Sequence, residues 1–184
     1  MCGLGGVFHF GSDLKVLEAE LLRVGEAMKH RGPDGHGHWL CDTGRIGLVH
    51  RRLTIIDLSE RANQPMKDIT SRVHIVFNGE IYNHKSLRLM LEKAGRRFNT
   101  NNSDTEVLIH GYLEWGFEEL LSRLKGMFAF ALWDSQNEQL FLARDRIGIK
   151  PLYFSLNQGS IFFSSEIKSL LQFSSLPREL STEA

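Results

Sequence analysis

Short apolar runs that come in blocks, rather than in strict alternation with helical segments, constrain the fold of this chain most strongly. Strand-length runs occupy residues 3–10, 37–41, 45–50, 52–56, 73–77, 127–133, 139–144, 151–155 and 160–165. Helical patterns occupy residues 13–30, 84–94, a segment that begins at 103, 117–124 and 166–172. Such blocks favour an α+β fold in which helices pack outside mainly antiparallel sheets. With 184 residues, the chain can bury one sizeable core, so we expect one domain.

Two of the predicted helices have recognisable beginnings. The first is predicted from apolar residues at spacings of three and four, which place them on one helix face. These residues are Leu14, Leu17, Leu21, Val24 and Met28. Ser12 or Asp13 is positioned to cap this helix. The later helix begins at Ser103, and Glu106 follows at the spacing of a capping box.

Composition excludes several classes of protein. Lys plus Arg equals Asp plus Glu at 22 each, so no global field draws the chain to nucleic acid or to an anionic membrane. No run approaches the roughly 20 apolar residues of a membrane span, and the first residues do not have a signal-peptide pattern. The two cysteines, Cys2 and Cys41, fit a reducing cytosol, so we expect a cytoplasmic protein in which Cys41 is structural.

Metal and nucleotide sites are not predicted. His36 and His38 share a strand face, but no third ligand lies nearby in sequence, and the histidines have no zinc-site spacing. No phosphate-binding glycine loop follows a strand. Arg144, Asp145 and Arg146 are predicted to form a buried or interfacial ion network without a catalytic role.

Cys2 becomes the first residue if the initiator Met1 is removed, as happens when the second residue is small. Its α-amine would then have a reference pKa of about 7.7–8.0 and could act as the general base for its own thiol. N-terminal threonine enzymes use this arrangement, and a thiol is the better nucleophile. Taken alone, a cysteine at the edge of a strand is more simply a small buried side chain.

Three further positions admit both a structural and a chemical interpretation. Asn78-Gly79 ends the apolar run 73–77 and on its own favours a two-residue hairpin turn, but an amide and a backbone N–H could also form an oxyanion hole. Arg52 could bind a substrate carboxylate, although a solvated strand-end charge is the simpler interpretation. Asp104 could hold a substrate ammonium, although a helix cap is the simpler interpretation.

The order of these features resembles the class II glutamine amidotransferases, which use an N-terminal nucleophile. Within that class, the chain is similar to the amino-terminal half of the asparagine synthetases. The motifs that carry the resemblance are Met1-Cys2-Gly3, His30 to Asp34, His50 to Asp57, Asn63 to Met66, Phe77 to Asn83, Ser103 to Glu106, Gly126 to Asp134, Arg144 to Tyr153 and Ser164 to Lys168. They define a predicted domain at 1–172, with 173–184 as a tail or the start of a linker to a synthetase domain. The resemblance implies a four-layer αββα sandwich, the N-terminal nucleophile hydrolase fold.

The resemblance also implies roles for the matching residues in the hydrolysis of glutamine to glutamate and ammonia. The catalytic positions are Cys2 as the nucleophile and Asn78 with Gly79 as the oxyanion hole, and the glutamine-binding positions are Arg52, Leu53, Thr54, Ile55, Ile56, Glu80 and Asp104. Arg52 would bind the α-carboxylate, and residues 53–56 would line the pocket through backbone groups. Glu80 and Asp104 would lie near the α-amino group.

In this family, a second domain activates aspartate with ATP and magnesium and receives ammonia through an internal tunnel. Its Ser-Gly-Gly-x-Asp-Ser pyrophosphate loop does not occur in this sequence. We therefore expect a glutaminase domain that has no cofactor of its own and serves a synthetase domain of the same full-length chain or a partner subunit. A homodimer is also compatible with the pattern. Two alternatives stay open: an amidotransferase for another carboxylate acceptor, such as a β-lactam precursor or a modified peptide, and a non-catalytic docking module.

Overall fold

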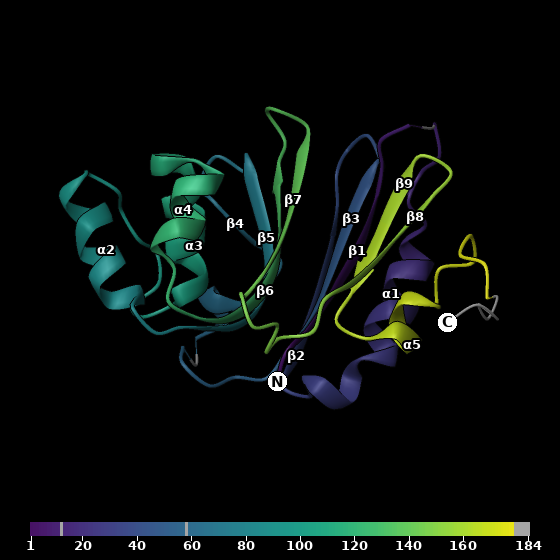
Figure 1. Cartoon of the computed structure of the whole chain (residues 1–184), viewed down its shortest axis with the longest axis horizontal. Helices are drawn as coiled ribbons and strands as arrows, with labels where there is room; N and C mark the ends of the chain where they lie inside the picture. The colour runs from purple at the N-terminus through teal and green to yellow at the C-terminus, as the bar shows by residue number, and fades with distance from the viewer. Residues whose placement is uncertain (12, 58, 179–184) are drawn as a thin grey trace.

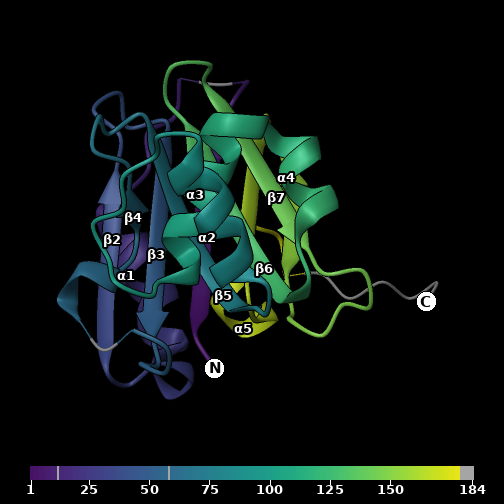
Figure 2. The same ribbon diagram turned by 90° about the vertical axis from the view of Figure 1, so that its left-hand side faces the viewer.

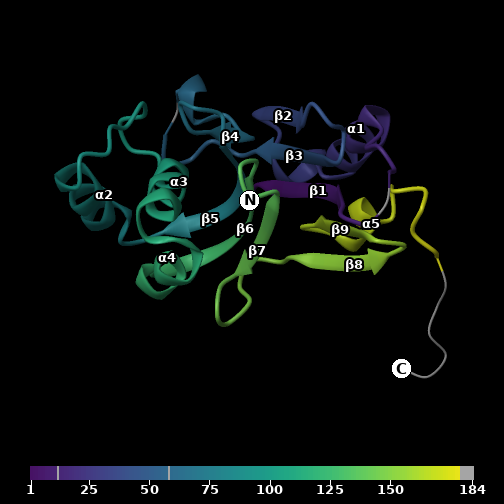
Figure 3. The ribbon, with the colours of Figure 1, turned by 90° about the horizontal axis from the view of Figure 1, so that it is seen from above.

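Two antiparallel sheets face each other at the centre of the molecule, and helices cover their outer surfaces (Figure 1). The computed structural model describes residues 1–11, 13–57 and 59–178. Seen from above, α1 and α2 lie on opposite sides of the molecule (Figure 3), and the side view looks onto α2, α3 and α4 in front of the strands (Figure 2). The predicted four-layer αββα sandwich is therefore confirmed.

The first sheet has five strands in the order β2-β3-β1-β9-β8. Its strands are β1 (Gly3–His9), β2 (Gly35–Leu40), β3 (Ile46–Arg52), β8 (Tyr153–Asn157) and β9 (Ser160–Ser164). The buried glycines of β1 allow close packing, since a Cβ at Gly6 would lie 2.4 Å from the Gly47 carbonyl oxygen. The glycine-rich start of the chain thus becomes the central strand of this sheet.

The second sheet has four strands in the order β4-β5-β6-β7. Its strands are β4 (Met66–Lys67), β5 (Val73–Ile81), β6 (Gly126–Asp134) and β7 (Gln139–Arg144). The two central strands pair along their whole length, from Val73 opposite Asp134 to Ile81 opposite Gly126. The short strand β4 was not predicted.

Helices α1 (Glu18–Ala27) and α5 (Ile167–Leu170) cover the first sheet, while α2 (His84–Lys93), α3 (Asp104–Trp115) and α4 (Phe117–Arg123) cover the second. Two 3₁₀ turns lie at Lys29–Arg31 and Glu60–Ala62. Among the described residues, no helix is long and apolar enough to cross a membrane.

Three apolar clusters hold the four layers together. One joins the four-stranded sheet to its helices, and its members include Ile75, Phe77, Leu108 and Phe130. The second lies between the sheets and includes Leu4, Leu48, Val76, Ala131 and Phe163. The third joins the five-stranded sheet to its helices and includes Val7, Leu21, Val24, Phe162 and Phe173. Alternate residues of β1 and β5 belong to different clusters, as expected for strands covered on both faces.

The prediction of a helix over 13–30 was wrong at its beginning. The helix begins at Glu18, and Leu17 occupies the N-cap position. The Val16 N–H donates to the Gly44 carbonyl instead of joining a helical turn. Leu14 and Leu17 are consequently exposed, whereas the rest of the predicted apolar face is buried. Ser12, one of the two proposed caps, lies outside the described residues.

The predicted capping box at Ser103 is also absent, although the helix begins there as expected. Ser103 is the N-cap of α3 but makes no side-chain capping bond. The Glu106 carboxylate instead accepts hydrogen bonds from the backbone N–H groups of Asn99 and Thr100. It therefore ties the preceding loop to the helix.

Two residues after position 172 pack against the first sheet and its helices. Phe173 and Leu176 are buried in the third apolar cluster, beyond the boundary expected at 172. Residues 174–178 form no helix or strand. The rest of the predicted tail or linker, residues 179–184, lies outside the described residues.

Candidate active site

Cys2 lies at the start of β1, where this central strand of the first sheet faces the loop that follows β3. The Leu53 N–H donates to Cys2 Sγ at 3.3 Å, and the thiol lies 3.6 Å from the Leu53 carbonyl oxygen. The Arg31 guanidinium holds the Cys2 carbonyl oxygen through Nε at 2.9 Å. Two elements distant in sequence therefore fix the thiol and the backbone of Cys2.

The surroundings of Cys2 favour a protonated thiol. Burial raises the pKa of the Cys2 thiol, and this effect exceeds the opposing effects of the Leu53 N–H, the N-terminal charge and Arg52. A thiol of this kind needs a base before it can attack a carbonyl carbon, because the thiolate is the nucleophile.

The prediction that a strand ends at Asn78-Gly79 was wrong, and so was the hairpin alternative. Both residues lie inside β5, which continues to Ile81 opposite β6. A Cβ on Gly79 would lie 2.2 Å from the Met127 carbonyl oxygen, so the close approach of β6 requires glycine here. The pair is therefore not a turn but part of a central strand.

The Asn78 side chain offers a hydrogen-bond donor at the pocket. Asn78 is buried and lines the same pocket as Cys2. Its Nδ2 has no hydrogen-bond partner among the described residues. Because a buried amide without a partner is costly, this group fits a site in which a ligand oxygen completes its bonding.

The Gly79 N–H is not bonded to the neighbouring strand β6. Phe128 lies opposite Gly79 on β6 and bonds to Asp145 with both of its backbone groups. The Phe128 N–H donates to Asp145 Oδ2 at 3.1 Å, and the Phe128 carbonyl accepts the Asp145 N–H at 2.8 Å, on the side of β6 that faces away from β5. Gly79 and Phe128 are therefore a non-hydrogen-bonded pair of the antiparallel ladder, and the Gly79 N–H points away from β6.

Neighbouring N–H groups on this edge of β5 are taken by side chains. The Phe77 N–H donates to Gln64 Oε1 at 2.6 Å, and the Ile81 N–H donates to Asp104 Oδ2 at 3.1 Å. Gly79 lies between Phe77 and Ile81 in the strand. Its N–H points in the same direction as theirs, because the N–H groups of alternate strand residues point to the same side. Asn78 Nδ2 and Gly79 N–H can therefore both serve the pocket that Gln64 and Asp104 line.

Arg52, at the end of β3, lines the pocket and is nearly buried. Its guanidinium donates to the Ser59 carbonyl at 3.0 Å, to Asn63 Oδ1 at 2.6 Å and to the Asp57 carbonyl. The interpretation of Arg52 as a solvated strand-end charge is therefore wrong. These bonds hold the guanidinium at one wall of the pocket, where it can meet an anionic group.

The predicted strand over 52–56 is an irregular loop beyond Arg52. Its backbone is used for the site, since Leu53 contacts the thiol and the Thr54 N–H donates to Asp34 Oδ2 at 2.8 Å. Leu53, Ile55 and Ile56 line the pocket, whereas Thr54 is not among the lining residues.

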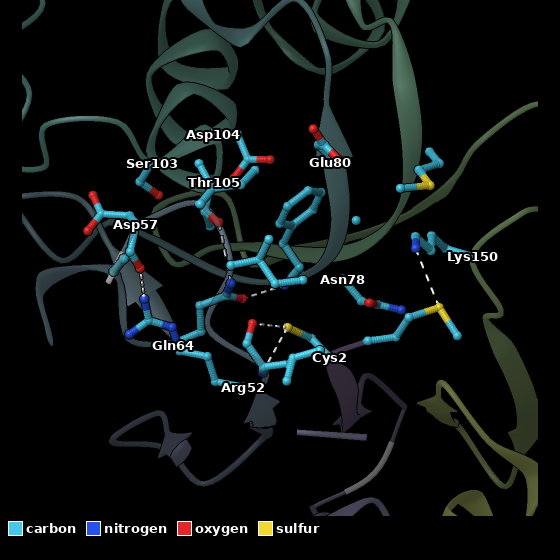
Figure 4. A pocket seen from close by; sticks show the side chains of 18 residues that line it. Cys2, Arg52, Asp57, Gln64, Asn78, Glu80, Ser103, Asp104, Thr105 and Lys150 are labelled. Carbon is cyan, nitrogen blue, oxygen red and sulfur yellow. Dashed lines mark hydrogen bonds between the residues drawn. The ribbon is translucent and has the colours of Figure 1, made fainter. Parts of the chain in front are cut away.

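Two acidic residues complete the opposite wall of the pocket (Figure 4). Glu80 comes from β5, and Asp104 is the first residue of α3. Burial raises the pKa of the Asp104 carboxyl, and bonds from the Ile81 N–H and the first turn of the helix oppose that rise. A cationic group placed between these two carboxylates would be favourably bound.

Gln64 and Arg31, to which the sequence assigned no role, also contribute to this site. Gln64 bridges β5 and α3, since its Nε2 donates to Thr105 Oγ1 at 3.3 Å. Arg31 holds the Cys2 carbonyl and pairs with Glu166 at 3.1 Å. Both belong to motifs noted in the sequence, but only their contacts reveal these functions.

The predicted ion network at Arg144–Arg146 was wrong. In the described part of the chain none of these side chains forms an ion pair, and Arg144 donates instead to the carbonyls of Gly148 and Lys150. The Asp145 carboxylate accepts the N–H groups of Ile149 and Lys150. These bonds shape a tight loop that carries Lys150 to the pocket. Across residues 1–11, 13–57 and 59–178, no cluster of three or more His, Cys, Asp or Glu side chains could hold a metal ion.

Comparison with known proteins agrees with this geometry. A family model described as a glutamine amidotransferase domain matches residues 1–184. The chain belongs to the glutamine amidotransferase domain family. In this chain a cysteine thiol, two hydrogen-bond donors and charged side chains line one pocket.

The curated relatives are longer than this chain. Glutamine-hydrolysing asparagine synthetase 1 of Bacillus subtilis is 42% identical over 173 residues, which cover 93% of this chain and 27% of that protein. Amidase chry2 of Gibberella zeae is 40% identical over 182 residues, which cover 94% of this chain and 27% of that protein. The chain thus spans about a quarter of the length of these relatives.

A solved amidotransferase shares the fold. Glutamine phosphoribosylpyrophosphate amidotransferase from B. subtilis superimposes with a TM-score of 0.72 at 22% identity, over 91% of this chain and 42% of that one. At this identity the likeness concerns the fold alone.

Proposed function

We propose that this domain hydrolyses glutamine, with Cys2 as the nucleophile after removal of Met1. The observation that carries the proposal is the meeting of the Cys2 thiol with two donors, Asn78 Nδ2 and the Gly79 N–H, in one pocket. A nucleophile facing preorganised donors is the arrangement that acyl transfer requires.

In the proposed reaction, the Cys2 thiol gives its proton to its own α-amine and its sulfur attacks the side-chain carbonyl carbon of glutamine. Asn78 and Gly79 stabilise the oxyanion. The Cys2 ammonium then returns the proton to the leaving amide nitrogen, so that ammonia departs and a γ-glutamyl thioester forms. Water hydrolyses the thioester, which releases glutamate and restores the thiol.

Charged groups at the two ends of the pocket support glutamine as the substrate. Arg52 is available for the α-carboxylate, and Glu80 with Asp104 for the α-ammonium. With both groups of the amino acid held, the length of its side chain decides whether the amide carbonyl reaches Cys2. Asparagine is one methylene shorter and would misplace its carbonyl, and small misplacements cost much rate.

We further propose that the ammonia is used by a synthetase domain, of the same full-length chain or of a partner subunit. The asparagine synthetase relatives, of which this chain matches about a quarter, support aspartate as the acceptor. ATP and magnesium would then be needed by the synthetase domain, and no cofactor by this one. Reduced cysteines are consistent with a cytoplasmic site of action.

A different acceptor is the second candidate. The amidases chry2 of Gibberella zeae and chyE of Penicillium rubens are 40% and 45% identical to this chain. Relatives of this domain therefore occur in proteins that are not named asparagine synthetases. Assay of the full-length protein with glutamine, ATP and candidate carboxylates separates these acceptors.

Glutamate release from glutamine by the mature chain tests the proposed hydrolysis. We expect release that is abolished in Cys2→Ala and retained in the matched control Cys41→Ala, because Cys41 lies outside the pocket. Full activity of Cys2→Ala would refute the mechanism. No release by a chain shown to have lost Met1 would instead favour a non-catalytic docking module.

A further inference from the structure

Lys150 is a buried cation at the pocket that the proposed mechanism does not use. Its side chain lies among the residues that line the pocket, and only 6% of its surface is exposed. Its Nζ lies 3.5 Å from Met1 Sδ, and the dashed line that begins at Lys150 in Figure 4 marks this contact. Lys150 is therefore placed beside the residue whose removal creates the catalytic amine.

The position of Lys150 is firmly set by its backbone. The Lys150 N–H donates to Asp145 Oδ2 at 3.0 Å, and its carbonyl accepts from Arg144 Nε at 2.8 Å. No carboxylate in the described part of the chain forms an ion pair with the Lys150 ammonium. Because an unpaired buried ammonium is unfavourable, its retention here calls for a functional explanation.

Removal of Met1 changes what Lys150 faces. The bond from Met1 to the Cys2 nitrogen is lost, and that nitrogen becomes an α-amine in the pocket that Cys2 and Lys150 both line. Like charges that share a partly buried pocket disfavour each other. The neutral form of the amine, which is the form that can accept the thiol proton, is then favoured.

We propose that Lys150 is a positioning residue whose ammonium disfavours protonation of the Cys2 α-amine and so keeps that amine available as the general base. This inference rests on the proposed glutaminase function. It adds an electrostatic control of the base by a residue outside the nucleophile and the oxyanion hole.

Other charged groups also face Cys2. The cations are Arg31 and Arg52, and the carboxylates are Glu80, Asp104 and, behind Arg31, Glu166. Arg31 is engaged by the Cys2 carbonyl and Glu166, and Arg52 is held by the loop after β3 at the wall where the substrate carboxylate would bind. Lys150 is distinguished by contact with the residue attached to the amine. Its removal should therefore change the amine more than the thiol.

The first test is the pH dependence of glutamine hydrolysis by mature wild type and Lys150→Met. We expect the acidic limb of kcat/KM to move about one pH unit higher in Lys150→Met, so that kcat/KM falls about tenfold near pH 6.5 but little near pH 9. Lys150→Arg should keep the wild-type limb, and so should the control Lys93→Met, which removes an exposed lysine on α2. A uniform loss at every pH, or an unmoved limb, would overturn the proposal.

The second test does not depend on turnover. The ¹⁵N signal of the Cys2 α-amine, followed across pH in protein labelled with ¹⁵N-cysteine, reports protonation of the amine directly. We expect a midpoint about one pH unit higher in Lys150→Met than in wild type, with Lys150→Gln as a second neutral variant if Lys150→Met does not fold. Equal midpoints would refute the role of Lys150 even if glutamine is hydrolysed. A shifted midpoint without hydrolysis would uphold it and count against the glutaminase function alone.

Discussion

At the scale of single residues, the unpartnered amide of Asn78 carries the strongest chemical expectation. Asn78→Ala should lower kcat for glutamine hydrolysis by roughly 10²–10³, the usual loss for one oxyanion donor. Steady-state kinetics with glutamine measure this loss. Asn101→Ala, which changes an exposed asparagine outside the pocket, should leave kcat unchanged. An unaltered kcat in Asn78→Ala would remove Asn78 from the oxyanion hole.

Asp104 permits a substitution that removes charge but keeps a structural bond. In Asp104→Asn, the amide oxygen can still accept the Ile81 N–H, so the edge of β5 should be preserved. We expect a higher KM for glutamine with kcat nearly unchanged, because the carboxylate would bind the ammonium equally in the ground and transition states. A fall in kcat at constant KM would contradict this role.

Some of these site residues could be predicted from the sequence alone, and others could not. Cys2 and Arg52 could be proposed from residue type and position, but Asn78-Gly79 by itself indicated a turn. Only its pairing with β6 shows that the Gly79 N–H is directed away from that strand. The contacts of Arg31, Gln64 and Lys150 join segments far apart in the chain, so no local pattern could have revealed them.

At the scale of elements, most strands and helices follow their apolar periodicity, and the errors occur where backbone groups bond outside the local pattern. Val16 donates to Gly44, which delays the first helix, and Leu53 donates to the Cys2 thiol in the loop where a strand over 52–56 was predicted. Tertiary contacts override propensity at such positions. The second of these departures is also where the site is built.

Glu106 offers a test of how α3 is anchored. Burial alone would raise the pKa of the Glu106 carboxyl, but His110 at 3.6 Å and hydrogen bonds from Asn99 and Thr100 outweigh burial and lower that pKa to about 2. At neutral pH, Glu106→Gln should therefore reduce the free energy of unfolding by about 2–3 kcal/mol. Urea denaturation followed by circular dichroism measures the difference.

The sign of the pH dependence follows from the lowered pKa. The contribution of Glu106 is complete above the pKa of about 4.5 expected for the unfolded chain, and it is lost as pH falls towards the folded value of about 2. The difference between Glu106→Gln and wild type should consequently shrink between pH 5 and pH 3. A difference that stays constant over this range would show that the carboxylate charge is not what stabilises α3.

At the scale of the whole molecule, the pocket depends on both sheets. Cys2 and Arg52 come from the five-stranded sheet, Asn78 and Gly79 from the four-stranded sheet, and Asp104 from a helix on its outer face. The inter-sheet apolar cluster therefore sets the distance between nucleophile and donors. The family resemblance predicted this sandwich, whereas periodicity alone predicted only an α+β fold.

The most direct test of the account is the intact mass of the purified chain, measured with and without a glutamine-like diazoketone that alkylates nucleophilic thiols. We predict loss of Met1 and a single adduct that maps to Cys2 and is prevented by excess glutamine. Retention of Met1, an adduct at Cys41 or no adduct would contradict the claim that Cys2 is the nucleophile of a glutamine-binding site.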